Sequence, residues 1–176
     1  SAAAGIAMAA DRNPLFLDRY LPLSVDQSIS AATGNRVMRG QIAEVGNLAG
    51  ASFGGERSGS SRLLYIVLAS VLENANIDWM VFTATRPLLF SLKRLGLAPV
   101  DLGAAAGSCL DKIERQNWGS YYEHEPRVVA APLASANQSI EARAQFASIR
   151  AHYQAEIESM AQELNAWVYV SERRSQ

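Results

Sequence analysis

The chain has one cysteine, Cys109, among its 176 residues. A single cysteine can form neither an internal disulfide framework nor a cluster of thiolate metal ligands. No basic segment precedes the mildly apolar stretch from Ala2 to Ala10, so the sequence does not predict a secretory signal. These absences favour a soluble protein in a reducing, cytoplasmic compartment.

Long hydrophobic runs and a strong net charge are also absent. The apolar stretch from Leu63 to Leu72 stops at Glu73, short of the roughly 18 residues that a membrane-spanning helix needs. The formal net charge is -1, so no overall field attracts nucleic acid or an anionic membrane. We therefore expect no transmembrane segment and no nucleic-acid partner.

Several catalytic motifs are missing as well. The chain has no Gly-x-Ser-x-Gly elbow, no P-loop lysine motif and no Cys/His pair, which disfavours serine hydrolases, nucleotidases and cysteine enzymes. Its two histidines, His124 and His152, do not have metal-ligand spacing, so no metal site is predicted. A hydrophobic content of 49% is typical of a domain that buries a core.

The order of apolar segments predicts an α/β fold. Two strands joined by a hairpin are expected near residues 2–10 and 15–17, followed by a short helix that Ser24 caps and Gly34 ends. An extended segment follows from Val37. The remaining predicted elements alternate between helix and strand over residues 63–72, 79–84, 85–96, 99–102, 108–115 and 127–131.

The last forty residues have a different pattern. Apolar residues recur there at steps of three and four: Ala142, Phe146, Ile149, Tyr153, Ile157, Met160, Leu164 and Trp167. This spacing predicts one long amphipathic helix, and it divides the chain into a domain over residues 1–135 and a helical segment over residues 136–176. The helix either packs on its own domain or is buried against a second copy. Four glutamates between the apolar positions disfavour a membrane-surface helix.

A strand-like segment that includes Glu44, Gly46 and Asn47 is the first candidate site. Gly46 predicts a β-bulge or a close approach of backbone to a ligand, although an edge strand also tolerates a glycine. Partial burial would make Glu44 a competent general base; the alternative is a surface salt bridge to Arg36 or Arg39. Asn47 either donates a hydrogen bond to a substrate carbonyl or caps its own loop.

A second candidate is the aromatic loop from Trp118 to Pro126. The hydroxyl of Tyr121 or Tyr122 is a candidate general acid for a departing thiolate, and His124 is a candidate proton shuttle. Aromatic loops also serve as simple lids over a core, so this alternative remains open.

The third candidate is a Gly/Ser-rich loop over residues 50–61. Backbone amides near Gly59 and Ser60, at the start of the next helix, could bind phosphate. A small basic patch is predicted around this loop and the helix after strand 79–84: Arg57, Arg62, Arg86 and Lys93. The patch suits coenzyme A phosphates or an acidic carrier protein, and its alternative is an ordinary solvated face.

Four separated blocks resemble one known family: residues 15–21, 44–49, 79–85, and 118–122 with 126–129. In this order they resemble the thermostable hemolysin family, over roughly Ala3 to Leu133. That family is in turn similar to the GCN5-related N-acetyltransferase (GNAT) superfamily and to the acyl-homoserine lactone synthases. The resemblance implies a GNAT-like mixed sheet flanked by helices that lacks part of the usual N-terminal region.

The resemblance also implies a function: transfer of an acyl group from acyl-CoA, or from the phosphopantetheine of an acyl carrier protein, to an amine or hydroxyl acceptor. Glu44 would be the base and Tyr121 or Tyr122 the acid. The implied thioester-binding residues are Val45, Gly46, Asn47, Leu48, Thr83 and Thr85. The loop over residues 56–61 departs from the superfamily's pyrophosphate motif in having an acid first and a serine last. The alternative function is a non-catalytic protein on the same fold, either membrane-active in the manner of a hemolysin or an interaction protein.

Overall fold

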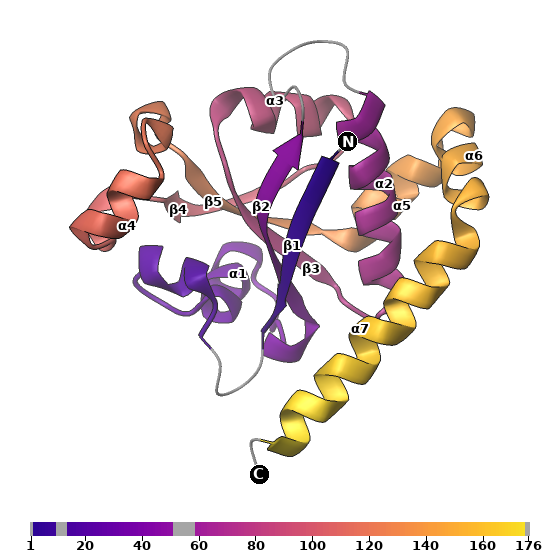
Figure 1. The fold of residues 1–176 in the computed structure, drawn as a ribbon, viewed down its shortest axis with the longest axis horizontal. Coiled ribbons are helices and arrows are strands. Elements are labelled where there is room, and N and C mark those ends of the chain that lie inside the picture. The colour runs from indigo at the N-terminus through magenta and orange to yellow at the C-terminus, as the bar shows by residue number, and fades with distance from the viewer. Residues whose placement is uncertain (1, 10–13, 51–58, 175–176) are drawn as a thin grey trace.

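The protein forms a five-stranded mixed sheet with helices on both faces (Figure 1). The computed structural model describes residues 2–9, 14–50 and 59–174, and it describes side chains for residues 4–9, 14–46 and 62–166. The strands are β1 (Ala2–Met8), β2 (Ile42–Gly50), β3 (Trp79–Ala84), β4 (Val100–Ala104) and β5 (Arg127–Pro132). Their order is β1-β2-β3-β5-β4, in which β2 and β3 are parallel and the other neighbours antiparallel.

Helices follow or connect the strands along the whole chain. The α-helices are α1 (Val25–Thr33), α2 (Gly59–Asn74), α3 (Arg86–Arg94), α4 (Lys112–Asn117), α5 (Leu133–Glu141), α6 (Ala144–His152) and α7 (Gln154–Arg174). Short 3-10 helices are η1 (Phe16–Tyr20), η2 (Arg39–Gln41), η3 (Gly107–Cys109) and η4 (Tyr121–His124). The predicted α/β class is therefore confirmed, as are the helix that ends at Gly34 and the strand at 79–84.

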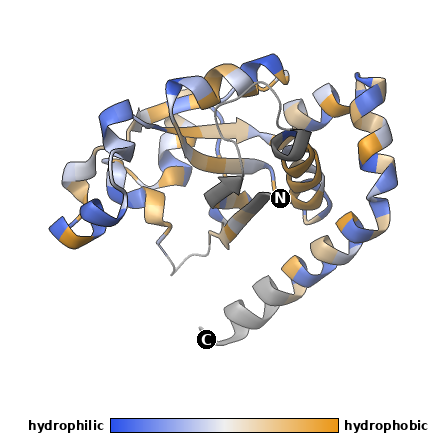
Figure 2. Ribbon diagram, turned by 45° about the horizontal axis from the view of Figure 1, so that its top comes forward, coloured by the Kyte–Doolittle hydropathy of each residue, from blue (hydrophilic) through white to orange (hydrophobic). Residues whose placement is uncertain are grey.

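Two hydrophobic cores lie on opposite faces of the sheet. In β3, Met80 and Phe82 pack with α2 and the C-terminal helices, whereas Val81 packs with η1 and α1. This division follows from the two-residue period of a strand, which directs successive side chains to opposite faces. Helix α2 is hydrophobic along most of its length because it lies between the sheet and the C-terminal helices (Figure 2).

The strand predicted at residues 15–17 is wrong, because this segment leads into η1. Leu15 and Leu17 are buried and Phe16 is exposed, which imitates the alternation of a strand. The carboxylate of Asp18 accepts a 2.8 Å hydrogen bond from the amide of Leu15 and closes a tight turn instead. β1 pairs with β2, not with a hairpin partner; residues 10–13 of the predicted hairpin turn lie outside the described residues.

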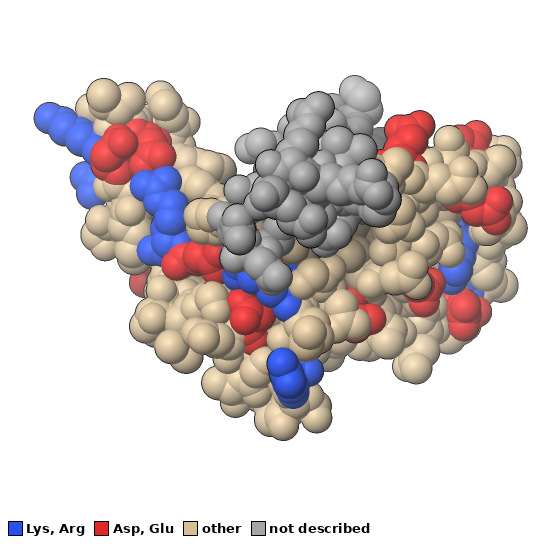
Figure 3. Space-filling model, turned by 90° about the horizontal axis from the view of Figure 1, so that it is seen from below, with Lys and Arg blue, Asp and Glu red and all other residues tan. Residues whose placement is uncertain are grey.

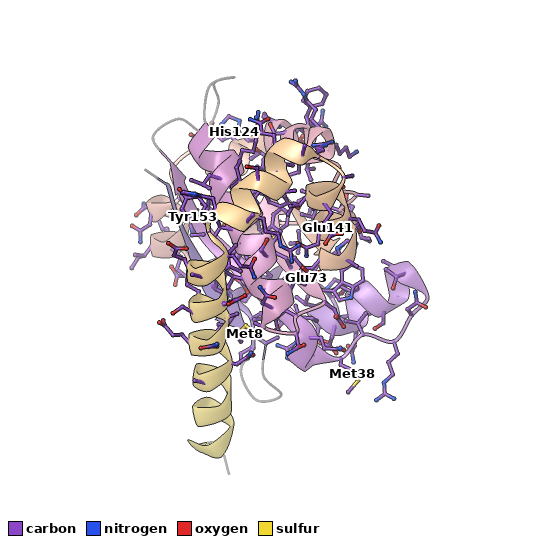
Figure 4. The ribbon with its side chains drawn as sticks, turned by 90° about the vertical axis from the view of Figure 1, so that its right-hand side faces the viewer. Met8, Met38, Glu73, His124, Glu141 and Tyr153 are labelled. Atoms are coloured by element: carbon purple, nitrogen blue, oxygen red, sulfur yellow. The ribbon has the colours of Figure 1, made fainter. Side chains whose placement is uncertain are left out.

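The single long helix predicted within residues 136–176 is also wrong, because three helices, α5, α6 and α7, occupy this segment. The backbone is extended at Arg143, and at Tyr153 it leaves the helical region again. These breaks let Phe146 and Ile157 reach the core of the chain's own domain. Figure 4 shows α6 and α7 running down one side of the molecule, with the far end of α7 extending past the body.

The surface carries both acidic and basic side chains. Acidic and basic side chains are interspersed over the face that Figure 3 displays, as a net charge near zero suggests. Within residues 2–9, 14–50 and 59–174, no helix combines the length and the apolar character that crossing a bilayer requires.

Candidate functional site

The two parallel strands at the centre of the sheet separate halfway along their length. β2 and β3 pair from Ile42 and Trp79 to Glu44 and Val81. Beyond this point, within the described residues, β2 pairs with β1 and β3 pairs with β5, up to Ala84, but β2 and β3 no longer pair with each other. An opening between two strands therefore begins at Glu44, and we call it the β2/β3 gap.

A β-bulge lies on the β1 side of the same segment. Gly5 pairs with Gly46, whereas Ala3 pairs with Ala49, so β2 has one extra residue between these positions. The predicted irregularity at Gly46 is confirmed. The backbone of Gly46 does not have a positive φ, and a Cβ atom there would meet no described atom within 4 Å. The glycine thus leaves open space beside the gap.

Glu44 is buried at the mouth of this gap. Its side chain is 8% exposed, and its Oε2 atom accepts a 3.2 Å hydrogen bond from the amide of Leu17. Burial raises the pKa of the Glu44 carboxyl, and the hydrogen bonds from the amides of Leu17 and Phe16 only partly oppose this. The surface salt bridge considered for Glu44 is excluded by this burial.

Thr83 and Tyr121 meet on the same face of the sheet as Glu44. Thr83 lies two residues beyond Val81 and so about 7 Å further along β3. The Tyr121 hydroxyl donates a 2.8 Å hydrogen bond to Oγ1 of Thr83. Burial raises the pKa of Tyr121, although the hydrogen bond with Thr83 opposes the shift. The structure therefore brings together two predicted site residues that are 38 positions apart.

Tyr122 has a different partner, Tyr20 of η1, which was not predicted as a site residue. Their hydroxyl oxygens are 2.5 Å apart. Burial first, and then the hydrogen bond to Tyr122, raise the pKa of Tyr20 far above its ordinary value. The rings of Tyr122, Tyr121 and Trp118 contact one another within 6.3 Å. Tyr122 thus packs the aromatic loop against the core that contains Val81, η1 and α1.

Asp18 and Arg39 fix the segment that contacts Glu44. The Asp18 carboxylate accepts hydrogen bonds from the amides of Leu15 and Val25, at 2.8 Å each, and pairs with Arg39 at 2.7 Å. Burial alone would raise the pKa of Asp18, but the Arg39 and amide hydrogen bonds outweigh it and lower the pKa. The sequence offers no motif for this network, because its members are distant in the chain.

Val45 and Thr85 complete the described part of the predicted thioester site. Val45 is buried on the opposite sheet face from Glu44, in the core that contains α2. Thr85 is the N-cap residue of α3, with Pro in the first turn as expected. Asn47 and Leu48 belong to β2, but their side chains lie outside the described ones.

The predicted basic residues do not gather at one point. Arg62 lies with its guanidinium 5.9 Å from the ring centre of Phe146, and Arg86 lies 3.6 Å from a carboxylate oxygen of Glu125. Arg86 and Lys93 occupy opposite ends of α3, about 10 Å apart along its axis.

Two of the predicted phosphate-binding residues, Gly59 and Ser60, form the first turn of α2, for which only the backbone is described. Arg57 lies outside the described residues.

The histidines take no part in these contacts. His124 is exposed at the edge of the molecule (Figure 4), and His152 packs edge-on against Tyr153. No group of three or more His, Cys, Asp or Glu side chains in the described part of the chain is arranged to hold a metal ion.

Comparison with known proteins gives one match. The family model described as thermostable hemolysin matches residues 1–137, so the chain belongs to the thermostable hemolysin family. No curated protein and no solved structure matches the chain significantly. The family resemblance in the four sequence blocks is therefore confirmed.

Proposed function

We propose that this member of the thermostable hemolysin family is an acyltransferase that moves an acyl group from a thioester to an amine or hydroxyl acceptor. The observation that carries the proposal is the separation of β2 and β3 directly after Glu44 and Val81. Parallel strands that separate leave backbone N–H and C=O groups facing an opening. The pantetheine arm of coenzyme A or of an acyl carrier protein has amide groups that can pair with them.

The separation of β2 and β3 beside Glu44 also supports the resemblance to the GNAT superfamily. The first turns of α2 and α3 lie at the end of the sheet where β2 finishes (Figure 1). Helix N-termini favour negative charge, so this end suits the phosphate groups of the donor. Arg86 is paired with Glu125 and Arg62 lies over the ring of Phe146, so the helix N-termini carry this argument.

In the mechanism that we propose, Glu44 takes a proton from the acceptor amine or hydroxyl, directly or through one water. The acceptor then attacks the thioester carbonyl carbon, and its new bond to that carbon replaces the bond to sulfur. Tyr121 gives its hydroxyl proton to the departing thiolate, and the proton held by Glu44 returns to the tyrosine through solvent. The raised pKa of Glu44 moves its carboxyl toward neutral pH, as a general base requires. The raised pKa of Tyr121 keeps its hydroxyl protonated until the thiolate forms.

Tyr121 is the better candidate acid of the two neighbouring tyrosines. Its hydroxyl already donates toward the gap, to Thr83, whereas the hydroxyl of Tyr122 is paired with Tyr20. When the donor sulfur lies in the gap, Tyr121 needs only to exchange Thr83 for the thiolate as its acceptor. Tyr122 then acts as a support for the aromatic loop.

A second candidate function, a non-catalytic protein on the same fold, is favoured by one contact. Glu44 holds the amide of Leu17, and a carboxylate with this task alone would serve η1 and not a substrate. This interpretation predicts no specific binding of acyl thioesters.

Calorimetric titration with octanoyl-CoA and, separately, with octanoyl carrier protein distinguishes the two functions. We expect one donor molecule to bind per chain, and the tighter of the two donors identifies the source of the acyl group. Absence of binding by both, together with no acyl adduct in the intact mass, would contradict the acyltransferase proposal and favour the second candidate.

A further inference from the structure

Tyr65 in the second turn of α2 has a buried hydroxyl without a hydrogen-bond partner in the described part of the chain. The residue is 9% exposed. Buried tyrosine hydroxyls nearly always have a partner, because an unpaired polar group loses its bonds to water and gains nothing in return. The other buried hydroxyls follow this rule: Ser70, for example, donates to the carbonyl of Ile66 at 2.9 Å.

Tyr65 packs on the face of the sheet that carries the first residues of the β2/β3 gap. Long side chains in an α-helix lean toward the helix N-terminus, and the first turn of α2 lies beside the end of β2 (Figure 1). Tyr65 belongs to the same buried cluster as Val45 and Phe82. These two residues directly follow the last paired residues of β2 and β3.

The gap thus has different chemistry on its two sides. Glu44 and Thr83 lie on one face of the sheet, with the groups that move protons in the proposed mechanism. Val45, Phe82 and Tyr65 lie on the other face, in the hydrophobic cluster that contains α2. Burial raises the pKa of Tyr65, so its hydroxyl remains protonated and can donate a hydrogen bond.

We propose that Tyr65 is a donor-binding residue whose hydroxyl donates a hydrogen bond to a carbonyl oxygen in the pantetheine arm of the acyl thioester. This inference rests on the acyltransferase function proposed above. It assigns the donor arm to the α2 face of the gap and leaves the Glu44 face to the acceptor. The Tyr65 hydroxyl, unpaired among the described residues of the free protein, would then gain its hydrogen-bond acceptor when the donor binds.

The test is Tyr65→Phe, which removes one oxygen atom and preserves the packing of the ring. Calorimetry with octanoyl-pantetheine as the probe measures affinity, and urea unfolding measures the stability of the free protein. Tyr153→Phe is the matched control, because Tyr153 is a half-buried tyrosine at the junction of α6 and α7 (Figure 4). We expect Tyr65→Phe to weaken probe binding about 3- to 10-fold, with the urea midpoint unchanged or higher. The control should bind as the wild type does.

Two results would overturn the inference, and they are distinguishable. Equal binding of the probe by wild type and Tyr65→Phe, with a lower urea midpoint in the variant, would mean that a water or a protein group satisfies the hydroxyl. The acyltransferase proposal would survive that result. Failure of the wild type itself to bind the probe would overturn the inference together with the function on which it rests.

Discussion

The carboxylate of Glu44 accepts a hydrogen bond from the amide of Leu17, 27 residues earlier in the chain. This contact joins the point where β2 leaves β3 to the 3-10 helix η1. Glu44 therefore has one oxygen that holds neighbouring backbone, while its carboxyl lies at the mouth of the β2/β3 gap. Glu44 thus has two roles to distinguish: it holds the backbone of η1, and it is the proposed base.

The first prediction concerns the dependence of stability on pH. Burial raises the pKa of Glu44 in the folded protein above its ordinary value of 4.5. The folded state therefore holds this proton at pH values where the unfolded state has lost it, and the residue's contribution to stability falls as pH rises through that interval. Glu44→Gln, which cannot ionise, should gain stability relative to wild type as pH rises from 4 to 8.

Urea unfolding of both proteins across this pH range measures the difference, and comparison with wild type cancels the titration of other groups. A difference in unfolding free energy that is flat with pH would show that the carboxyl does not have a raised pKa.

The second prediction separates the two neighbouring tyrosines. Tyr121→Phe and Tyr122→Phe each remove one hydroxyl hydrogen bond, to Thr83 and Tyr20 respectively, and should each cost about 1 kcal/mol of stability. Because only Tyr121 donates toward the gap, its loss should lower the acyl-transfer rate about 100-fold or more. Tyr122→Phe should remain within a few-fold of wild type. Equal losses in the two variants, measured by thiol release, would refute the assignment of the acid.

The third prediction uses the open space beside Gly46. Neither Gly46 nor Gly40 has a positive φ, and a Cβ at either position would meet no described atom within 4 Å. The described atoms therefore leave room for a Cβ atom at both positions. Gly46→Val should fill space at the gap and weaken donor binding about tenfold or more, whereas Gly40→Val in η2 should bind normally. Unimpaired octanoyl-CoA binding by Gly46→Val would place the donor elsewhere.

Much of the fold follows from local signals in the sequence. Strand β3 and helix α3 are predicted because an apolar run precedes a threonine cap and a proline in the first helical turn. The bulge in β2 is predicted from Gly46, since glycine inside a strand pattern signals an irregular ladder. These elements depend on residues that are neighbours in the chain.

The errors arise where hydrogen bonds or core packing override the local hydrophobic pattern. The alternation at residues 15–17 resembles a strand, but Asp18 and Glu44 accept hydrogen bonds from its amides and fold it into η1. The apolar spacing after Ser139 is continuous through three helices, because Phe146 and Ile157 pack into one core despite the breaks between them.

The sequence proposes site residues one by one, but not their pairings. Glu44 and Tyr121 are proposed from their residue types and surroundings, and Thr83 from the family resemblance, whereas the hydrogen bond between Thr83 and Tyr121 depends on the order of β3 and β5 in the sheet. Tyr20 and Tyr65 carry no sequence signal that separates them from core tyrosines. Only their burial, with one hydroxyl paired and the other unpaired, distinguishes them.

The central claim is that Glu44 is the base of an acyl transfer, and the most direct measurement is the turnover of Glu44→Gln. The matched control is Glu73→Gln, since Glu73 lies on α2 and pairs with Arg150 away from the gap (Figure 4). We predict that Glu44→Gln transfers octanoyl groups about 100-fold or more slowly than wild type, with donor affinity preserved, and that the control is unaffected. Turnover of Glu44→Gln equal to that of wild type would contradict the account.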